Sequence, residues 1–399
     1  MGLLKILFII TLLSIPIGEV LRFELTIGTS INPSNISVGV LVIYWLALHL
    51  FKKKKINTGK LLRPIAIFAG IGFISLVFNL KFLNVQELVV SFLYLIRWVM
   101  YAFIYFILLE FDKHFQRKIP YIMLFSGGLI LFAGYVQYFF YPSLRNLFYL
   151  GWDEHLYRMF SSFLDPNFAG AFFSLYFFLV IFMTEKFYDK KKMLSSILLG
   201  TLAVLTFAAI FLTYSRSGIL MLLVGSLIFL FMRKKIAFVI VLILIIFTMI
   251  TITPRAFKTE GTDLFRKISS EARISSAKQA ISIFLKNPVL GIGFNAYKFA
   301  KYRFGFTTLK FDPSHAEGGA DISLLFVMAT TGVIGLISYI YLFSKIIMTS
   351  YKKYKKSFIA GVLFVSMMSL IVNSFFINSL FYSFIMLWIW VLAGLTENV

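Results

Sequence analysis

The stretch "MLSSILLGTLAVLTFAAIFLTYSRSGILMLLVGSLIFLFM", residues 193–232, decides the fold class. It consists of two long apolar runs, and its only charged side chain is Arg216. A helix needs about 20 apolar residues to cross a bilayer, and in lipid the backbone must satisfy its own hydrogen bonds. The stretch therefore predicts two membrane-spanning helices joined by the turn "TYSRSG". The place of Arg216 matters, because a lone guanidinium at the bilayer centre costs roughly 2.5–3.5 kcal/mol on insertion scales.

The same pattern extends over the whole chain of 399 residues, of which 60% are hydrophobic and only 14% are charged. Soluble domains carry about 25% charged residues, so we expect a single integral membrane domain over residues 1–399 with an all-α, polytopic fold. Cysteine is absent, which excludes disulfides and thiolate metal sites. The sequence predicts about twelve spans, at residues 4–21, 36–51, 62–80, 87–110, 119–141, 166–184, 193–213, 217–232, 236–253, 319–343, 357–375 and 379–395.

The formal charge of +22 fits this topology. Basic clusters such as 52–55, 233–235 and 351–356 fall in every second connection, and that side of the membrane carries more than half of the 39 Lys and Arg residues. By the positive-inside rule this side is cytoplasmic, together with both termini. The basic excess therefore indicates the lipid bilayer as a partner rather than nucleic acid, and it places the Arg216 turn at the outer surface.

The longest outer connection, residues 254–318, is expected to contain an interfacial helix. Within 266–288, apolar side chains such as Ile274 and Ile281 recur at helical spacing, and Pro288 with the following "GIG" predicts the end of the helix. Such a helix would lie in the outer interface with its apolar face toward the membrane and Arg273 at the level of the headgroups.

Several outer-face residues are candidates for chemistry. Arg158, Arg216 and Arg273 are arginines without a nearby carboxylate cluster, and arginine suits bidentate contacts to phosphate. His315 is placed to act as a base near neutral pH. Each has a plainer alternative, since Arg216 can be an interfacial anchor and His315 an inert loop residue. No acidic cluster of the kind that holds Mg²⁺ is evident, so we expect no metal and no cofactor.

Two further residues complete the candidates. Asn167 follows Asp165 and Pro166 at the expected start of a span, where helix capping is the simpler role, above all for Asp165. Arg97 lies near the middle of the span 87–110. Intramembrane arginines are usually functional, although Arg97 can also serve packing by pairing with a backbone carbonyl.

Four ordered stretches carry a resemblance to a known family. They are "RMFSSFLDPNFAG" (158–170), "LTYSRSG" (212–218), "EARISSAKQAISIFLKNPVLGIGFNAY" (271–297) and "SHAEGGADISLLFVMATTGVIG" (314–335). In this order the chain resembles the superfamily of O-antigen ligases and O-antigen polymerases of the bacterial envelope, with a family-like catalytic core at 158–335 that includes the outer loop. Ser161 and Ser162 stand where the family usually has Gly-Thr.

The resemblance implies a metal-independent, inverting glycosyltransferase in the bacterial inner membrane, with its active site on the outer face. It would transfer a saccharide from undecaprenyl diphosphate to the hydroxyl of a glycan acceptor. Arg216 and Arg273 would bind the diphosphate, His315 would be the catalytic base or orient the acceptor, and Arg158 and Asn167 would lie on the donor side. We favour a polymerase of capsule, exopolysaccharide or O-antigen units, and a ligase of finished glycan is the alternative. A flippase or other transporter of lipid-linked oligosaccharides is a third possibility, favoured only by Arg97.

Overall fold

The computed structural model describes residues 2–26, 29–53, 55–252, 260–263, 268–308 and 319–398, and this part of the chain is all-α. Its strands form a single short hairpin, in which β1 (Phe23–Thr26) pairs antiparallel with β2 (Thr29–Ile31). The all-α class predicted from the apolar runs is therefore confirmed.

Every predicted span coincides with an apolar helix. Six helical segments are long and apolar enough to cross a membrane, namely α2 (Pro33–Lys52), α4 (Val85–Leu109), Lys113–Phe140 with α5 (Lys113–Gln116) and α6 (Ile119–Phe140), α7 (Pro166–Asp189), α8 (Met193–Leu212) and α13 (Ser323–Lys353). Six more are shorter, namely α1 (Gly2–Leu13), α3 (Leu62–Phe78), α9 (Arg216–Met232), α10 (Phe238–Ile252), α14 (Phe358–Asn373) and α15 (Ser383–Glu397). A polytopic membrane protein is confirmed, and the number of twelve spans stays a prediction.

The outer surfaces of the peripheral helices are apolar. On α8, Leu194 is 73% exposed, and on α10, Ile240 is 68% exposed. Water would solvate such continuous aliphatic faces poorly, whereas lipid chains do so at no cost. Together with the long apolar helices, these faces identify the chain as an integral membrane protein.

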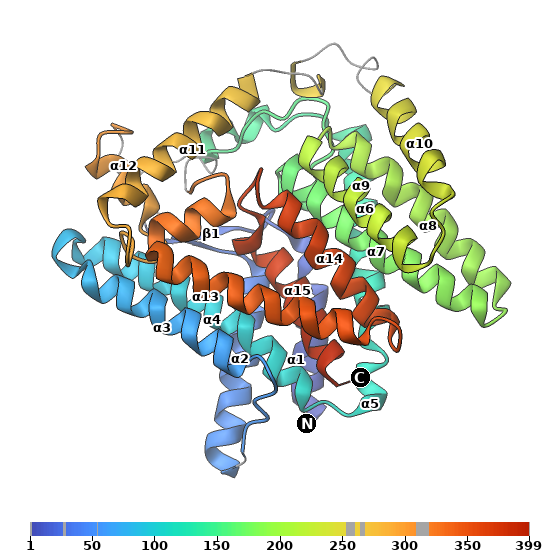
Figure 1. The fold of residues 1–399 in the computed structure, drawn as a ribbon, viewed down its shortest axis with the longest axis horizontal. Helices are drawn as coiled ribbons and strands as arrows, with labels where there is room; N and C mark the ends of the chain where they lie inside the picture. Colours follow the sequence, from blue (N-terminus) through green and yellow to red (C-terminus); the bar gives the residue numbers. More distant parts are fainter. Residues whose placement is uncertain are drawn as a thin grey trace.

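Two helices form the centre of the bundle. α15 is buried along nearly its whole length and packs on α4, and Figure 1 shows it surrounded by the other helices. α7 is also largely buried and packs against α8, α9 and α14. Because α7 is enclosed by these helices, its first residues are held in a rigid setting.

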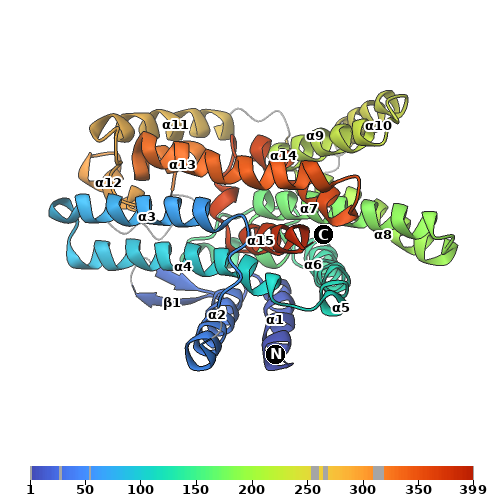
Figure 2. The same ribbon diagram turned by 60° about the horizontal axis from the view of Figure 1, so that its bottom comes forward.

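One side of the bundle is layered. Figure 2 shows α11 (Ile268–Lys286) lying over α13, with α3 and then α4 beneath it, and each neighbouring pair is in contact. α12 (Tyr297–Arg303) follows α11 and also contacts α13. The predicted helix within 266–288 is therefore confirmed, and it lies against the bundle rather than apart from it.

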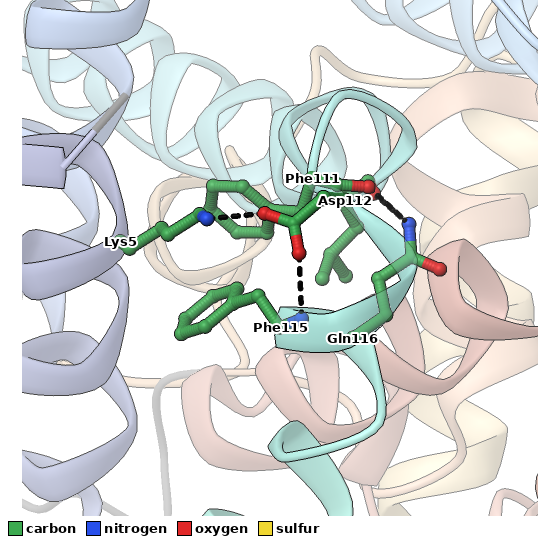
Figure 3. Close-up of polar contacts among 6 residues, drawn as sticks. Lys5, Phe111, Asp112, Phe115 and Gln116 are labelled. Carbon is green, nitrogen blue, oxygen red and sulfur yellow. Dashed lines mark hydrogen bonds and ion pairs between the residues drawn. The ribbon is translucent and has the colours of Figure 1, made fainter.

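Connections that are predicted to be cytoplasmic meet at one end of the molecule. Lys5 of α1 forms an ion pair with Asp112, whose other carboxylate oxygen accepts a hydrogen bond of 2.9 Å from the backbone N–H of Phe115 (Figure 3). Lys353 at the end of α13 donates to the carbonyl oxygens of Thr396 (3.0 Å) and Glu397 (2.7 Å). These contacts join helix ends that the charge pattern assigns to one side of the membrane.

Candidate active site

A cavity of about 440 Å³ lies at the opposite end, between the N-terminal segment, α4, α7, α11 and the start of α15. Its walls carry both charges and ring systems, so it is suited to a polar ligand rather than to a lipid chain. The charged side chains that line it are Glu19, Arg22, Arg97, Asp153, His155, Asp165, Arg273, Lys298 and Asp321.

Arg216 begins α9 directly beside this region. The turn after α8 ends in Ser215, whose hydroxyl accepts a hydrogen bond from the backbone N–H of Gly218 (3.2 Å) and so caps α9. Arg216 is therefore the first residue of the helix, at its positive dipole end, where anions are favoured. The short turn predicted between the two spans is confirmed, its outer location stays a prediction, and Arg216 is half-buried without lining the cavity itself.

The start of α7 lies next to the start of α9. Asp165 caps α7 through hydrogen bonds from the backbone N–H groups of Asn167 (2.6 Å) and Phe168 (3.3 Å), so its predicted capping role is confirmed. A Cβ on Gly218 would lie only 3.1 Å from the carbonyl carbon of Gly170, so a larger residue would push the two helices apart. Two helix N-termini thus point to the same end of the bundle, and Asn167 lines the cavity.

Arg158 connects these two helix starts. Its Nε donates to the carbonyl oxygen of Thr213 (2.9 Å), and its guanidinium also reaches the side-chain oxygen of Asn167 (3.4 Å) and the carbonyl oxygen of Tyr214 (3.5 Å). Only 5% of Arg158 is exposed, and it is not among the residues that line the cavity. Arg158 therefore holds the turn before Arg216, and its place on the donor side stays a prediction.

Arg273 reaches the site from α11. Arg273 lines the cavity, whereas Ile274 and Ile281 on the same helix are exposed, and its place at the level of the headgroups stays a prediction. Burial and the nearby positive charge of Arg216 lower the pKa of the Arg273 guanidinium, whereas Asp321 and Asp165 oppose that shift. The two arginines predicted to act together are thus electrostatic neighbours, although 57 residues separate them in sequence (273 − 216).

The turn after α11 explains the glycines of the "PVLGIG" stretch. Gly291 and Gly332 both have positive φ, and α13 is kinked at Gly332. A Cβ on Gly332 would lie 2.1 Å from the Val289 carbonyl oxygen. The backbones of the turn and the kink exchange hydrogen bonds, such as Val333 N–H to Pro288 O at 2.9 Å, and this contact fixes the C-terminal end of α11.

The remaining predicted residues have different outcomes. Arg97 faces the cavity, and its guanidinium lies 4.2 Å from the ring centroid of Tyr94. His315 lies outside the described residues, so its role stays a prediction. Another histidine, His155, lines the cavity, with its Nε2 4.0 Å from a carboxylate oxygen of Asp153.

Sequence reasoning missed several residues of the cavity wall. Arg22 follows the first helix and Lys298 lies on α12, far apart in the chain, and neither belongs to a recognisable motif. Burial and the nearby Arg22 lower the pKa of Lys298 to about 8. The only signal in the sequence is that both follow a predicted outer helix end, which is too common to single them out.

Comparison with known proteins agrees with the motif reading. Residues 201–340 match the family model described as O-Antigen ligase, which covers Arg216, Arg273 and the kink at Gly332. No curated protein matches the chain. The matched region therefore identifies the chain as similar to the O-antigen ligases, and the resemblance to the O-antigen ligase and polymerase superfamily that its motifs indicate is confirmed over these residues.

Proposed function

We propose that the protein is a glycosyltransferase of the bacterial inner membrane that transfers a saccharide from undecaprenyl diphosphate to a glycan hydroxyl at the outer face. The observation that carries this proposal is the juxtaposition of Arg216 and Arg273 beside a polar cavity of about 440 Å³. Their motifs are separate in the sequence, and a shared anionic ligand accounts for the approach of two like charges. A diphosphate supplies the negative charge that relieves their repulsion.

In the reaction, the acceptor hydroxyl attacks the anomeric carbon and the bond to the diphosphate breaks. Arg216 and Arg273 stabilise the charge that develops on the leaving diphosphate, and the N-terminal dipole of α9 adds to this effect. The proton of the acceptor passes to a base, for which His315 is the sequence-based candidate. Attack from the face opposite the leaving group inverts the anomeric configuration. No step requires a metal ion, so we expect chelators to leave the rate unchanged.

We favour polymerisation of capsule, exopolysaccharide or O-antigen repeat units. Ligation of finished glycan to lipid A core or another envelope acceptor is the second candidate, and the description of the matched family favours it. Comparing product length with and without free acceptor separates the two, because a polymerase extends lipid-linked chains without added acceptor. A transporter was favoured only by Arg97, whose position in the same cavity as Arg273 is also accounted for by the enzyme proposal.

The test uses purified protein in proteoliposomes with lipid-linked repeat units added to the outer face. The proposal requires release of undecaprenyl diphosphate together with glycan transfer, and the loss of both in Arg216→Ala. Arg145→Ala is a matched control, because Arg145 is an exposed arginine of the same outer side that does not line the cavity. Movement of the lipid across the bilayer without release would refute the proposal and support the transporter.

A further inference from the structure

The charged groups in and beside the cavity fall into two sets. The first surrounds Arg273, whose charged neighbours are Arg216, Asp321 and Asp165. The second surrounds Glu19, whose charged neighbours are Arg22 and Arg97. Lys298 belongs to the second set, because Arg22 is the charged neighbour that acts on it. We call this second set, Arg22, Arg97, Lys298 and Glu19, the N-terminal charge cluster.

The two sets differ in balance. Arg273 has two carboxylates, Asp321 and Asp165, as charged neighbours, whereas Arg22 and Arg97 both act on the single carboxylate of Glu19. That carboxylate is already engaged, since it accepts a hydrogen bond from Asn32 (2.9 Å) and lies 3.5 Å from the guanidinium of Arg22. Among the described residues Glu19 is thus paired with Arg22, and the guanidinium of Arg97 brings a further positive charge to the cavity.

Arg97 is the most informative member of the cluster. It lies within α4, which is long and apolar enough to cross a membrane, and an arginine at such a place is a functional candidate by default. Within the described part of the chain its guanidinium makes the cation–π contact with Tyr94 but has no hydrogen bond or ion pair. Its donors are thus directed to the cavity without a protein acceptor.

The wall between the two sets has groups suited to a sugar. The hydroxyl of Tyr382 and the side-chain oxygen of Asn378 are buried without a hydrogen-bond partner in the described structure, and both residues line the cavity. Tyr382 has Glu19, Arg22 and Asp165 as charged neighbours, so it lies between the two sets. Aromatic rings and amide groups together are typical of polar ligand sites that fix the orientation of their ligand.

From these contacts we propose that the N-terminal charge cluster is a subsite for an anionic saccharide, in which Arg22, Arg97 and Lys298 bind a carboxylate carried by the sugar. The substrate glycan of this protein is therefore acidic, of the uronic acid type. The inference deepens the proposed function, because it assigns the saccharide end of the cavity while Arg216 and Arg273 take the diphosphate. The inference rests on the proposed function only where it assigns the diphosphate to Arg216 and Arg273.

The experiment measures binding by calorimetry to the full-length protein in nanodiscs. The probes are a tetrasaccharide of alternating glucose and glucuronic acid, its carboxyl-reduced neutral form, and geranyl diphosphate. Wild type should bind the acidic tetrasaccharide at least about tenfold more tightly than the reduced form, as expected for charge-assisted hydrogen bonds. Arg97→Gln should remove most of that preference, and Arg97→Lys should retain part of it.

Variants of the diphosphate site should show the opposite result, which distinguishes it from the N-terminal charge cluster. Arg216→Gln should weaken binding of geranyl diphosphate but keep the preference for the acidic tetrasaccharide, and Arg145→Gln should change neither. If Arg97→Gln does not fold, Lys298→Gln on the short helix α12 provides the same test. Equal binding of the two tetrasaccharides by wild type overturns the inference. So does loss of the acidic preference in Arg216→Gln but not in Arg97→Gln. Because neither tetrasaccharide contains a diphosphate, the binding preference can be measured and interpreted even if the proposed transfer reaction fails.

Discussion

Replacing Gly332 by alanine should break the contact between the kink of α13 and the turn after α11. Gly332 has φ 69° and ψ −171°, a conformation that is essentially restricted to glycine and costs other residues about 1–3 kcal/mol. The new methyl group would lie 2.1 Å from the carbonyl oxygen and 2.3 Å from the carbonyl carbon of Val289. Relieving such a clash in a packed region typically costs another 1–3 kcal/mol, roughly.

The two elements can separate only by giving up their shared hydrogen bonds. Gly293 N–H donates to Thr330 O at 3.1 Å and Ile292 N–H to Ala329 O at 3.1 Å, and each is worth about 1 kcal/mol. We therefore expect the free energy of unfolding to fall by at least about 2 kcal/mol. The displaced α11 should also carry Arg273 out of place, and a shift of about 1 Å can lower turnover roughly 100-fold.

The assay combines thermal unfolding in detergent with diphosphate release in proteoliposomes. Gly70→Ala is the matched control, because a Cβ at Gly70 in α3 has no atom within 4 Å and should not lower the melting temperature. A Gly332→Ala protein that melts and turns over like the control would refute the proposed role of this contact.

Three further predictions follow from single groups. Arg158→Lys loses the hydrogen bond from Nε to the carbonyl oxygen of Thr213, which should lower the free energy of unfolding by about 1–3 kcal/mol. The variant should therefore melt at a lower temperature, and it should release diphosphate more slowly because the turn before Arg216 is less firmly held. Because the pKa of Lys298 is about 8, affinity for the acidic tetrasaccharide should fall as the pH rises through that value, and Lys298→Arg should abolish this dependence in a titration series. The Lys5 ion pair lowers the pKa of Asp112 from 3.8 to about 2, so its stabilising effect should be complete above about pH 4 and disappear as the pH falls toward 2. Melting curves of Asp112→Asn and wild type should therefore differ above pH 4 and converge at low pH; a constant difference would contradict the assignment.

The sequence predicted the helices well, because a lipid-embedded segment must be both apolar and helical. The Arg216 turn, the capping by Asp165 and the helix that ends before Pro288 all follow from local patterns of this kind. The cavity position of Arg273 on α11 did not follow from such a pattern, because the helical spacing shows that Ile274 and Ile281 share a face but not that Arg273 lines a cavity. In an interfacial helix, lipid competes with protein for apolar side chains, so periodicity does not tell which face meets the bundle.

The N-terminal charge cluster was beyond prediction for a different reason. Arg22, Arg97 and Lys298 lie far apart in the sequence, and only the folded chain brings them to one cavity. Arg97 was noticed as an isolated charge, but its neighbours were not. Residues that come together from such distant parts of the chain form no motif with a recognisable spacing in a single sequence.

The central claim is that Arg216 and Arg273 hold one diphosphate, and a double-mutant cycle on diphosphate release tests it most directly. Each arginine replaced by alanine should lower the rate about 100-fold or more, as for other groups that stabilise a leaving charge. The double variant should be little slower than the worse single variant, because residues that act as a unit are not additive. Wild-type release by either single variant, or losses that multiply in the double variant, would contradict the claim.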